Sequence, residues 1–212
     1  MNSKTPIKDT EIRKFTFEIR ADHDEQHGDF ITGRPIVYDS ITDMYGEFAE
    51  IIDRGALDDS DLKDVKFLVN HNTYMIPLAR SRNNNINSTM QMTTDDKGME
   101  IRVNLDTENN SDSKNLYSAI KRGDIDGMSF MFTVASAEWE SLDSDYPTRH
   151  IKKIGKVFEV SAVTFPAYAD TTISARSKAT LESERSKALE SAKEAELESL
   201  KQEIRNKIKK GV

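Results

Sequence analysis

Residues 157–165, Val-Phe-Glu-Val-Ser-Ala-Val-Thr-Phe, form an apolar segment interrupted by one carboxylate, and a similar segment, Gly-Met-Ser-Phe-Met-Phe, occupies residues 127–132. Each is apolar on both alternating faces: Phe130 and Phe132 share one face, and Met131 lies on the other with Ser129. A strand that is apolar on both faces is covered on both. We therefore expect a sheet with helices packed outside it.

Other segments with strand character accompany these two. Residues 13–20 alternate apolar and polar side chains, the period of a half-buried strand. Further short strands are expected at residues 30–38, 47–52, 65–70, 77–82, 86–93, 99–105, 128–139, 150–154 and 156–165. Many short strands separated by Gly- and Asn-rich turns are typical of a barrel or a sandwich. The predicted fold class is α+β, a mainly antiparallel β-barrel with helices outside it.

Two segments have helical character. Over Ser111–Arg122 the apolar residues recur at helical spacing, Ser111 or Asp112 is expected to cap the start, and Gly123 is placed to stop the helix. Residues 174–210 lack Gly, Pro and aromatic residues and predict a long amphipathic helix. The expected organisation is a flexible N-terminus (1–12), a barrel domain (13–173) and a charged helical tail (174–212).

Composition excludes several classes of protein. The 212 residues include no cysteine, which excludes disulfides, thiol catalysis and Cys-based zinc sites and fits a reducing cytoplasm. No segment has the length and apolar character of a signal peptide or a membrane span, so no membrane partner is expected. The first 173 residues hold 20 Lys/Arg against 30 Asp/Glu, net −10, whereas residues 174–212 carry +3. An acidic body repels phosphates, so no nucleic acid partner is expected.

Three residues within strand-like segments have the chemistry of a serine protease: His71, Ser129 and Glu159. A hydroxyl needs a histidine to take its proton, and an acid fixes the tautomer of that histidine. Each also has a structural alternative. Ser129 is alternatively a buried serine bonded to backbone, His71 a surface residue in a turn, and Glu159 an edge residue facing water. A buried Glu159 requires a partner, for which a histidine is the natural choice.

The sequence motifs around these residues resemble those of the prohead (capsid maturation) proteases of tailed bacteriophages, distant relatives of the herpesvirus assemblins. The resemblance runs from about Gly33 to about Thr172. Five segments carry it, in the order of the family: Gly33-Arg-Pro-Ile-Val-Tyr38, Glu47-Phe-Ala-Glu-Ile-Ile-Asp-Arg-Gly-Ala-Leu57, Asn70-His71, Arg122-Gly-Asp-Ile-Asp-Gly-Met-Ser-Phe-Met-Phe132 and Glu159-Val-Ser-Ala-Val-Thr-Phe-Pro-Ala167. Met131 stands where the family usually has glycine, and no arginine follows Glu159 until Arg176, so the oxyanion donors stay unassigned.

This resemblance implies an assemblin-like barrel and a serine endopeptidase without metal or cofactor. Ser129 would be the nucleophile, His71 the general base and Glu159 the acid that orients it. The implied substrates are the major capsid protein, the scaffold and the chain itself, and the implied place of action is the procapsid in the host cytoplasm. The tail would be either a solvated helix or a coiled coil that binds itself or capsid proteins. The alternative function is a non-catalytic scaffold or assembly chaperone on a degenerate protease fold.

Other candidate sites are weaker. The segment His23-Asp-Glu-Gln-His27 has two histidines but lies in a loop-like stretch, whereas a zinc-protease motif needs a helix to aim both imidazoles. Asp58-Asp-Ser-Asp61 lacks the glycine and closing glutamate of a calcium loop and predicts a solvated acidic turn. His150 and Ser161 are the fallback members of the triad.

Overall fold

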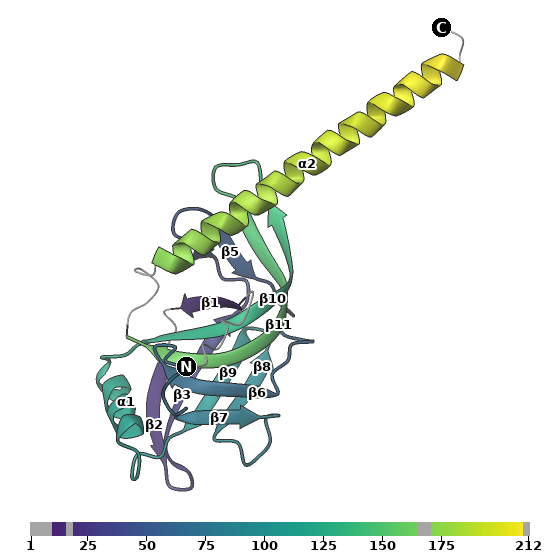
Figure 1. Cartoon of the computed structure of the whole chain (residues 1–212). Helices are drawn as coiled ribbons and strands as arrows, with labels where there is room; N and C mark the ends of the chain where they lie inside the picture. Colours follow the sequence, from purple (N-terminus) through teal and green to yellow (C-terminus); the bar gives the residue numbers. More distant parts are fainter. Residues whose placement is uncertain (1–9, 16–18, 165–170, 210–212) are drawn as a thin grey trace, which may run out of the picture.

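The computed structural model of the chain describes residues 10–15, 19–164 and 171–209, with two helices and eleven strands among them. The elements are β1 (Thr10–Phe15), β2 (Ile19–Asp24), β3 (Gly28–Val37), β4 (Thr42–Asp43), β5 (Ala49–Ile52), β6 (Asp64–Val69), β7 (Ala79–Arg82), β8 (Met90–Asp95), β9 (Gly98–Asn104), α1 (Ser111–Arg122), β10 (Gly127–Glu140), β11 (Thr148–Val163) and α2 (Thr171–Lys209). Most of the body is strand, and α2 projects from it as a long rod (Figure 1). The expected α+β class is confirmed.

The strands form two sheets rather than the predicted closed barrel. The larger sheet runs β1-β10-β11-β5-β4, with β6 also beside β11 and β7 beside β6. The smaller sheet runs β2-β3-β9-β8. Within the described part of the chain, no strand pairing closes either sheet or joins the two. The barrel is therefore not confirmed.

Strand β11 is the organising element of the larger sheet. It pairs antiparallel with β10 along one side and parallel with β5 and then β6 along the other. The sequence predicted two strands here, divided near Gly155, but one strand continues through that glycine. A Cβ at Gly155 would lie 2.9 Å from Thr133 Oγ1, so the close approach of β10 favours glycine. The expected strand over 13–20 is also different, because β1 ends at Phe15 and β2 begins at Ile19.

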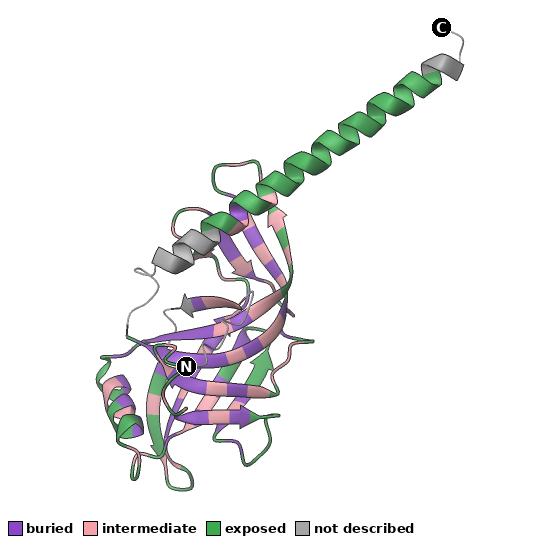
Figure 2. Ribbon diagram, viewed as in Figure 1, coloured by how far each residue is buried: buried purple, intermediate pink, exposed green. Residues whose placement is uncertain are grey.

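One apolar core joins both sheets. Its fully buried members include Phe67, Phe130 and Phe132 from the larger sheet and Ile36 and Ile101 from the smaller one. The purple bands in Figure 2 follow these strands through the body. Ser129 and Glu159 thus lie on strands that are fixed by packing from both faces, and His71 follows the end of β6.

Helix α1 has the predicted bounds but a different cap. Asn110, rather than Ser111 or Asp112, is the N-cap, and its side chain accepts hydrogen bonds from the backbone of Asp112 and Ser113. The helix stops at Gly123, whose φ of 77° is the left-handed conformation expected for a glycine C-cap. The helix contacts β2 and β3, outside the smaller sheet.

The first part of α2 is attached to the body, and the remainder is exposed. Leu181 is buried in a small cluster with Met44 and Phe48. Arg185 donates hydrogen bonds to the carbonyls of Leu142 and Ser144 in the β10–β11 loop. Beyond these contacts the described side chains of α2 are exposed, as the green length of the helix shows (Figure 2). Neither described helix is long and apolar enough to cross a membrane.

Candidate active site

The three predicted catalytic residues come from three neighbouring strands. Ser129 lies on β10, Glu159 lies on the adjacent β11, and His71 follows the end of β6, which pairs with β11 on its other side. The acid therefore lies on the central strand of the three. This order brings segments that are far apart in sequence to one region of the larger sheet.

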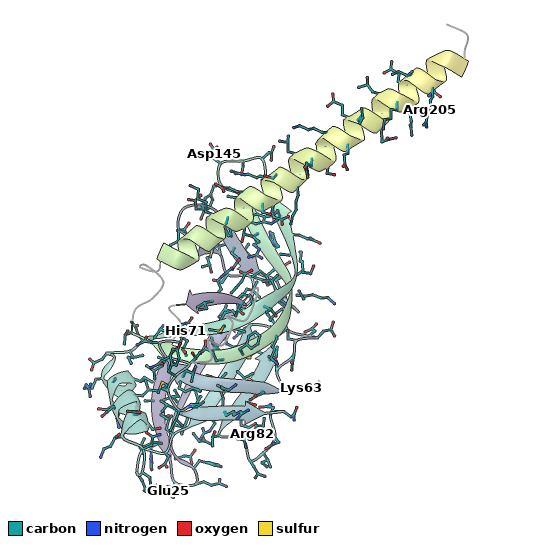
Figure 3. All side chains as sticks on the ribbon, viewed as in Figure 1. Glu25, Lys63, His71, Arg82, Asp145 and Arg205 are labelled. Carbon is teal, nitrogen blue, oxygen red and sulfur yellow. The ribbon has the colours of Figure 1, made fainter. Side chains whose placement is uncertain are left out.

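His71 and Glu159 are in direct contact. The imidazole Nδ1 lies 2.5 Å from Glu159 Oε1, and the carboxylate is almost completely buried, with 2% of Glu159 exposed. Glu159 is thus a buried, paired residue rather than an edge residue that faces water. Figure 3 labels His71 in the body of the chain, well away from Arg205 on the outer part of α2.

The turn that presents His71 has an unusual backbone. Asn70 and His71 adopt φ values of 51° and 56°, in the left-handed region that non-glycine residues rarely occupy. Asn70 is held by its own side chain, whose oxygen accepts a hydrogen bond from the backbone of Thr164 at 3.0 Å. Backbone of this kind persists when surrounding contacts fix it, and such residues cluster at functional sites.

The geometry gives the two ring nitrogens of His71 different roles. A carboxylate accepts hydrogen bonds only, so Glu159 fixes the proton of a neutral imidazole on Nδ1. The lone pair is then on Nε2, which is buried and has no hydrogen-bond partner among the described residues. A histidine that is held by an acid at Nδ1 and has a free Nε2 has the arrangement of a general base.

The hydroxyl that touches this pair belongs to Ser161, not to Ser129. Ser161 Oγ donates to Glu159 Oε2 at 2.6 Å and accepts the backbone N–H of His71 at 3.1 Å. From the sequence alone, Ser161 is only a fallback member of the triad. The spacing Glu-x-Ser within a strand was the available signal, because residues two apart point to the same face.

Ser129 is completely buried, and its hydroxyl donates to the backbone carbonyl of Arg13 on β1 at 2.7 Å. No hydrogen bond between Ser129 and His71 is present in the structure. Ser129 nevertheless lies directly opposite Ser161 in the β10–β11 ladder. Directly paired residues point to the same face with Cβ atoms about 4.5–5.5 Å apart. Ser129 therefore lies next to the Ser161-Glu159-His71 group, with its hydroxyl turned toward β1.

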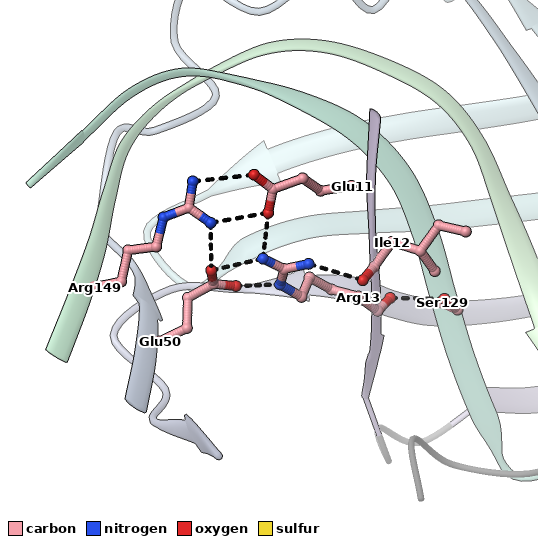
Figure 4. A network of polar contacts seen from close by, with 6 residues as sticks. All are labelled: Glu11, Ile12, Arg13, Glu50, Ser129 and Arg149. Atoms are coloured by element: carbon pink, nitrogen blue, oxygen red, sulfur yellow. Dashed lines mark hydrogen bonds and ion pairs between the residues drawn. The ribbon is translucent and has the colours of Figure 1, made fainter. Parts of the chain in front are cut away.

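A buried cluster of ion pairs fixes β1 in this position (Figure 4). The guanidinium of Arg13 binds Glu50 and Glu11, and that of Arg149 donates to the same two carboxylates at 2.9–3.1 Å. Burial opposes ionisation of Glu11, but the two arginines outweigh it and lower the pKa of that carboxyl. Burial likewise opposes the charge of Arg13, yet Glu50 and Glu11 raise the pKa of its guanidinium. The cluster was missed in the sequence because its members resemble ordinary surface charges.

The other candidates lie elsewhere. His150 Nδ1 lies 2.8 Å from Asp53 Oδ1, and its Nε2 faces Glu140, so it belongs to a separate ion pair. His23 and His27 are both exposed, and they contact Asp29 and Asp24 respectively.

No group of three or more metal-ligating side chains occurs among the described residues, the segments 23–27 and 58–61 included. In the second segment, Asp59 and Asp61 bind Lys153 and Lys156 instead.

Comparisons with known proteins place the chain in a family. A family model described as caudovirus prohead serine protease matches residues 15–186, which include His71, Ser129 and Glu159. The prohead protease of Enterobacteria phage HK97 is 30% identical over 114 residues, which cover 53% of this chain and 45% of the relative. The match thus spans less than half the length of that relative. No solved structure gives a significant match.

Proposed function

Because the chain belongs to the caudovirus prohead serine protease family, we propose that it is a serine endopeptidase in which Ser129, His71 and Glu159 form the catalytic triad. The observation that carries the proposal is the contact of His71 Nδ1 with Glu159 at 2.5 Å, together with an Nε2 that has no partner in the described part of the chain. In a histidine held in this way, Nε2 makes no hydrogen bond that stabilises the fold. It is ready to take a proton from a nucleophile.

The reaction follows from these positions. Ser129 Oγ forms a bond to the carbonyl carbon of the scissile peptide while its proton moves to His71 Nε2. The C–N bond then breaks, and the leaving amine takes the proton from the imidazolium, whose charge Glu159 stabilises. Water, deprotonated by the same nitrogen, then forms a bond to the acyl carbon; the ester bond to Ser129 Oγ breaks, and Oγ takes the proton back from the imidazolium. No metal or cofactor takes part in these steps.

The proposal requires one rearrangement. The Ser129 hydroxyl must exchange its acceptor, from the carbonyl of Arg13 to Nε2 of His71. The first acceptor belongs to β1, which pairs with β10, and the second belongs to a ring whose Nδ1 contacts Glu159 on β11, the other neighbour of β10. Rotation about the Cα–Cβ bond of Ser129, with a small shift of β1, is the motion we expect.

The proposed substrates are the major capsid protein, the scaffold and the chain itself, cut within the procapsid. Enclosure with the substrate raises its effective concentration, so a modest intrinsic rate is sufficient. The exposed outer part of α2 is proposed to bind a second copy of the chain or a capsid protein, since Leu197, Leu200 and Ile204 are all exposed there.

The test is product formation by the purified protein. The chain is incubated alone and with the major capsid protein of its own phage, and the products are identified by mass spectrometry. New, defined termini are expected with the wild-type protein and none with Ser129→Ala. Identical products from Ser129→Ala would contradict the assignment of the nucleophile.

A second function is favoured by one observation. Ser129 is fully buried and bonded to β1, as in a protein whose serine is structural. The alternative is a non-catalytic scaffold or assembly chaperone on a protease fold, which acts through α2. In that case neither wild-type chain nor capsid protein is cut, while the protein still promotes procapsid assembly.

A further inference from the structure

We propose that Ser161 is a positioning residue of this active site, whose hydroxyl holds the acid and the base of the triad in one geometry. The inference rests on the proposed function, because it assigns a role within that site. It concerns a residue on β11 that touches Glu159 and His71 and does not itself need to touch the substrate. Ser161 is fully buried.

The hydroxyl of Ser161 acts both as a hydrogen-bond donor and as an acceptor. It donates its one hydrogen to Glu159 Oε2 at 2.6 Å and accepts the backbone N–H of His71 at 3.1 Å. Glu159 Oε1 contacts the imidazole of the same histidine at 2.5 Å. The three residues therefore form a closed ring of contacts, in which Glu159 binds the side chain of His71 and Ser161 binds its backbone.

This ring explains how a strained turn keeps a defined orientation. His71 has a φ of 56°, and its N–H would have no partner in the sheet because β6 ends at Val69. The bond to Ser161 satisfies that N–H and fixes the backbone of the turn to β11. The bond from Ser161 to Oε2 leaves Oε1 as the oxygen that faces Nδ1. Neighbours that orient a functional group in this way typically change activity 10–100-fold in metal sites when they are removed.

The same contacts distinguish Ser161 from a nucleophile. Its proton is directed to the charged carboxylate of Glu159, whereas Ser129 donates to a neutral backbone carbonyl, and the charge-assisted bond is the stronger of the two. Nε2 of His71, the atom that would have to accept a nucleophile's proton, has no partner among the described residues. Ser129 and Ser161 face each other across the β10–β11 ladder, but their hydroxyls have different partners. Substitution of each serine in turn therefore separates the nucleophile from the positioning residue.

The first arm of the test is kinetic. Ser161→Ala leaves Glu159 Oε2 and the His71 N–H without their partner, so kcat is expected to fall about 10–100-fold with KM little changed. Ser161→Thr keeps a hydroxyl and is expected to recover most of the rate. Ser81→Ala is the matched control, because Ser81 on β7 is equally buried but its hydroxyl has no partner among the described residues.

The second arm needs no substrate. A proton held between Nδ1 and a carboxylate at this short distance gives a low-field NMR resonance. It is assigned to His71 by its loss in His71→Gln, and the His150–Asp53 pair provides an internal reference. In Ser161→Ala the His71 resonance is expected to move or disappear while the His150 resonance stays.

Two results would overturn the inference: wild-type kcat together with an unchanged His71 resonance in Ser161→Ala, or a fluorophosphonate adduct located on Ser161. If the wild-type protein cleaves nothing, the proposed function fails, and the resonance still decides whether Ser161 orients His71.

Discussion

Replacement of Glu159 by glutamine tests the electrostatics of the site with the least change in shape. In the wild-type protein both carboxylate oxygens accept hydrogen bonds, Oε1 from His71 Nδ1 and Oε2 from Ser161. A glutamine has one oxygen and one NH₂ group, so one of these two donors meets another donor. The conflict is relieved when the amide donates to Nδ1, which forces the imidazole proton onto Nε2.

That tautomer cannot accept a proton from Ser129, and the charge that stabilises the imidazolium is also lost. Substitution of the triad acid by its amide lowers turnover by about 10⁴ in a well-studied serine protease, so we expect a fall of about 10² to 10⁴ here. This fall corresponds to roughly 2.7–5.4 kcal/mol in activation free energy. The fold should survive, since no uncompensated charge is left in the core.

The assay measures peptide cleavage and melting temperature on the same variant. A purely structural pair would instead cost about 3–5 kcal/mol of stability, or roughly 6–20 °C in melting temperature. Asp53→Asn is the matched control, because Asp53 also contacts a histidine Nδ1, at 2.8 Å, but outside this site. An active, stable Glu159→Gln protein would remove Glu159 from the triad, and an unstable variant with normal activity per folded molecule would make the pair structural.

Three further predictions concern the rest of the chain. Glu50→Gln leaves two buried guanidinium groups without one of their carboxylates. The free energy of unfolding, measured by urea titration, is expected to fall by about 3–5 kcal/mol. An unchanged midpoint of urea unfolding would show that the ion-pair cluster does not stabilise the fold. The lowered pKa of Glu11 means that its contribution to stability is present above its unfolded pKa of 4.5 and is lost as pH falls through the folded value. Glu11→Gln should therefore make the melting temperature fall less steeply as the pH is lowered, and a fall as steep as in the wild-type protein would refute this. Truncation after Glu190 retains the buried Leu181, so the melting temperature and peptide cleavage should be preserved. Self-association, measured by sedimentation, should be abolished. A truncated protein that still self-associates would show that the outer part of α2 is not the surface through which two copies bind.

The sequence predicted those features that depend on neighbours in the chain. Helix α1 has the expected bounds because its periodicity and its glycine stop are local signals. The apolar surroundings of Glu159 required a partner, and His71 is that partner. The expected tail starts at residue 174, and α2 begins close by at Thr171, but the burial of Leu181 depends on Met44 and Phe48, which are far away in sequence.

The features that were missed depend on strand pairing. The predicted barrel is not confirmed, because the observed sheets are set by long-range pairing that no short segment encodes. The contact of Ser129 with β1 depends on which strand lies beside β10, and nothing in residues 10–15 indicates it. Arg13 and Glu50 lie 37 residues apart, so their buried ion pair has no local signature.

The most direct test of the central claim is covalent labelling of the wild-type protein with a fluorophosphonate, followed by location of the adduct by tandem mass spectrometry. An adduct is expected on Ser129, and its formation should require His71, so His71→Ala should remain unlabelled. A wild-type protein whose intact mass does not change, or an adduct on any residue other than Ser129, would contradict the assignment of Ser129 as the nucleophile.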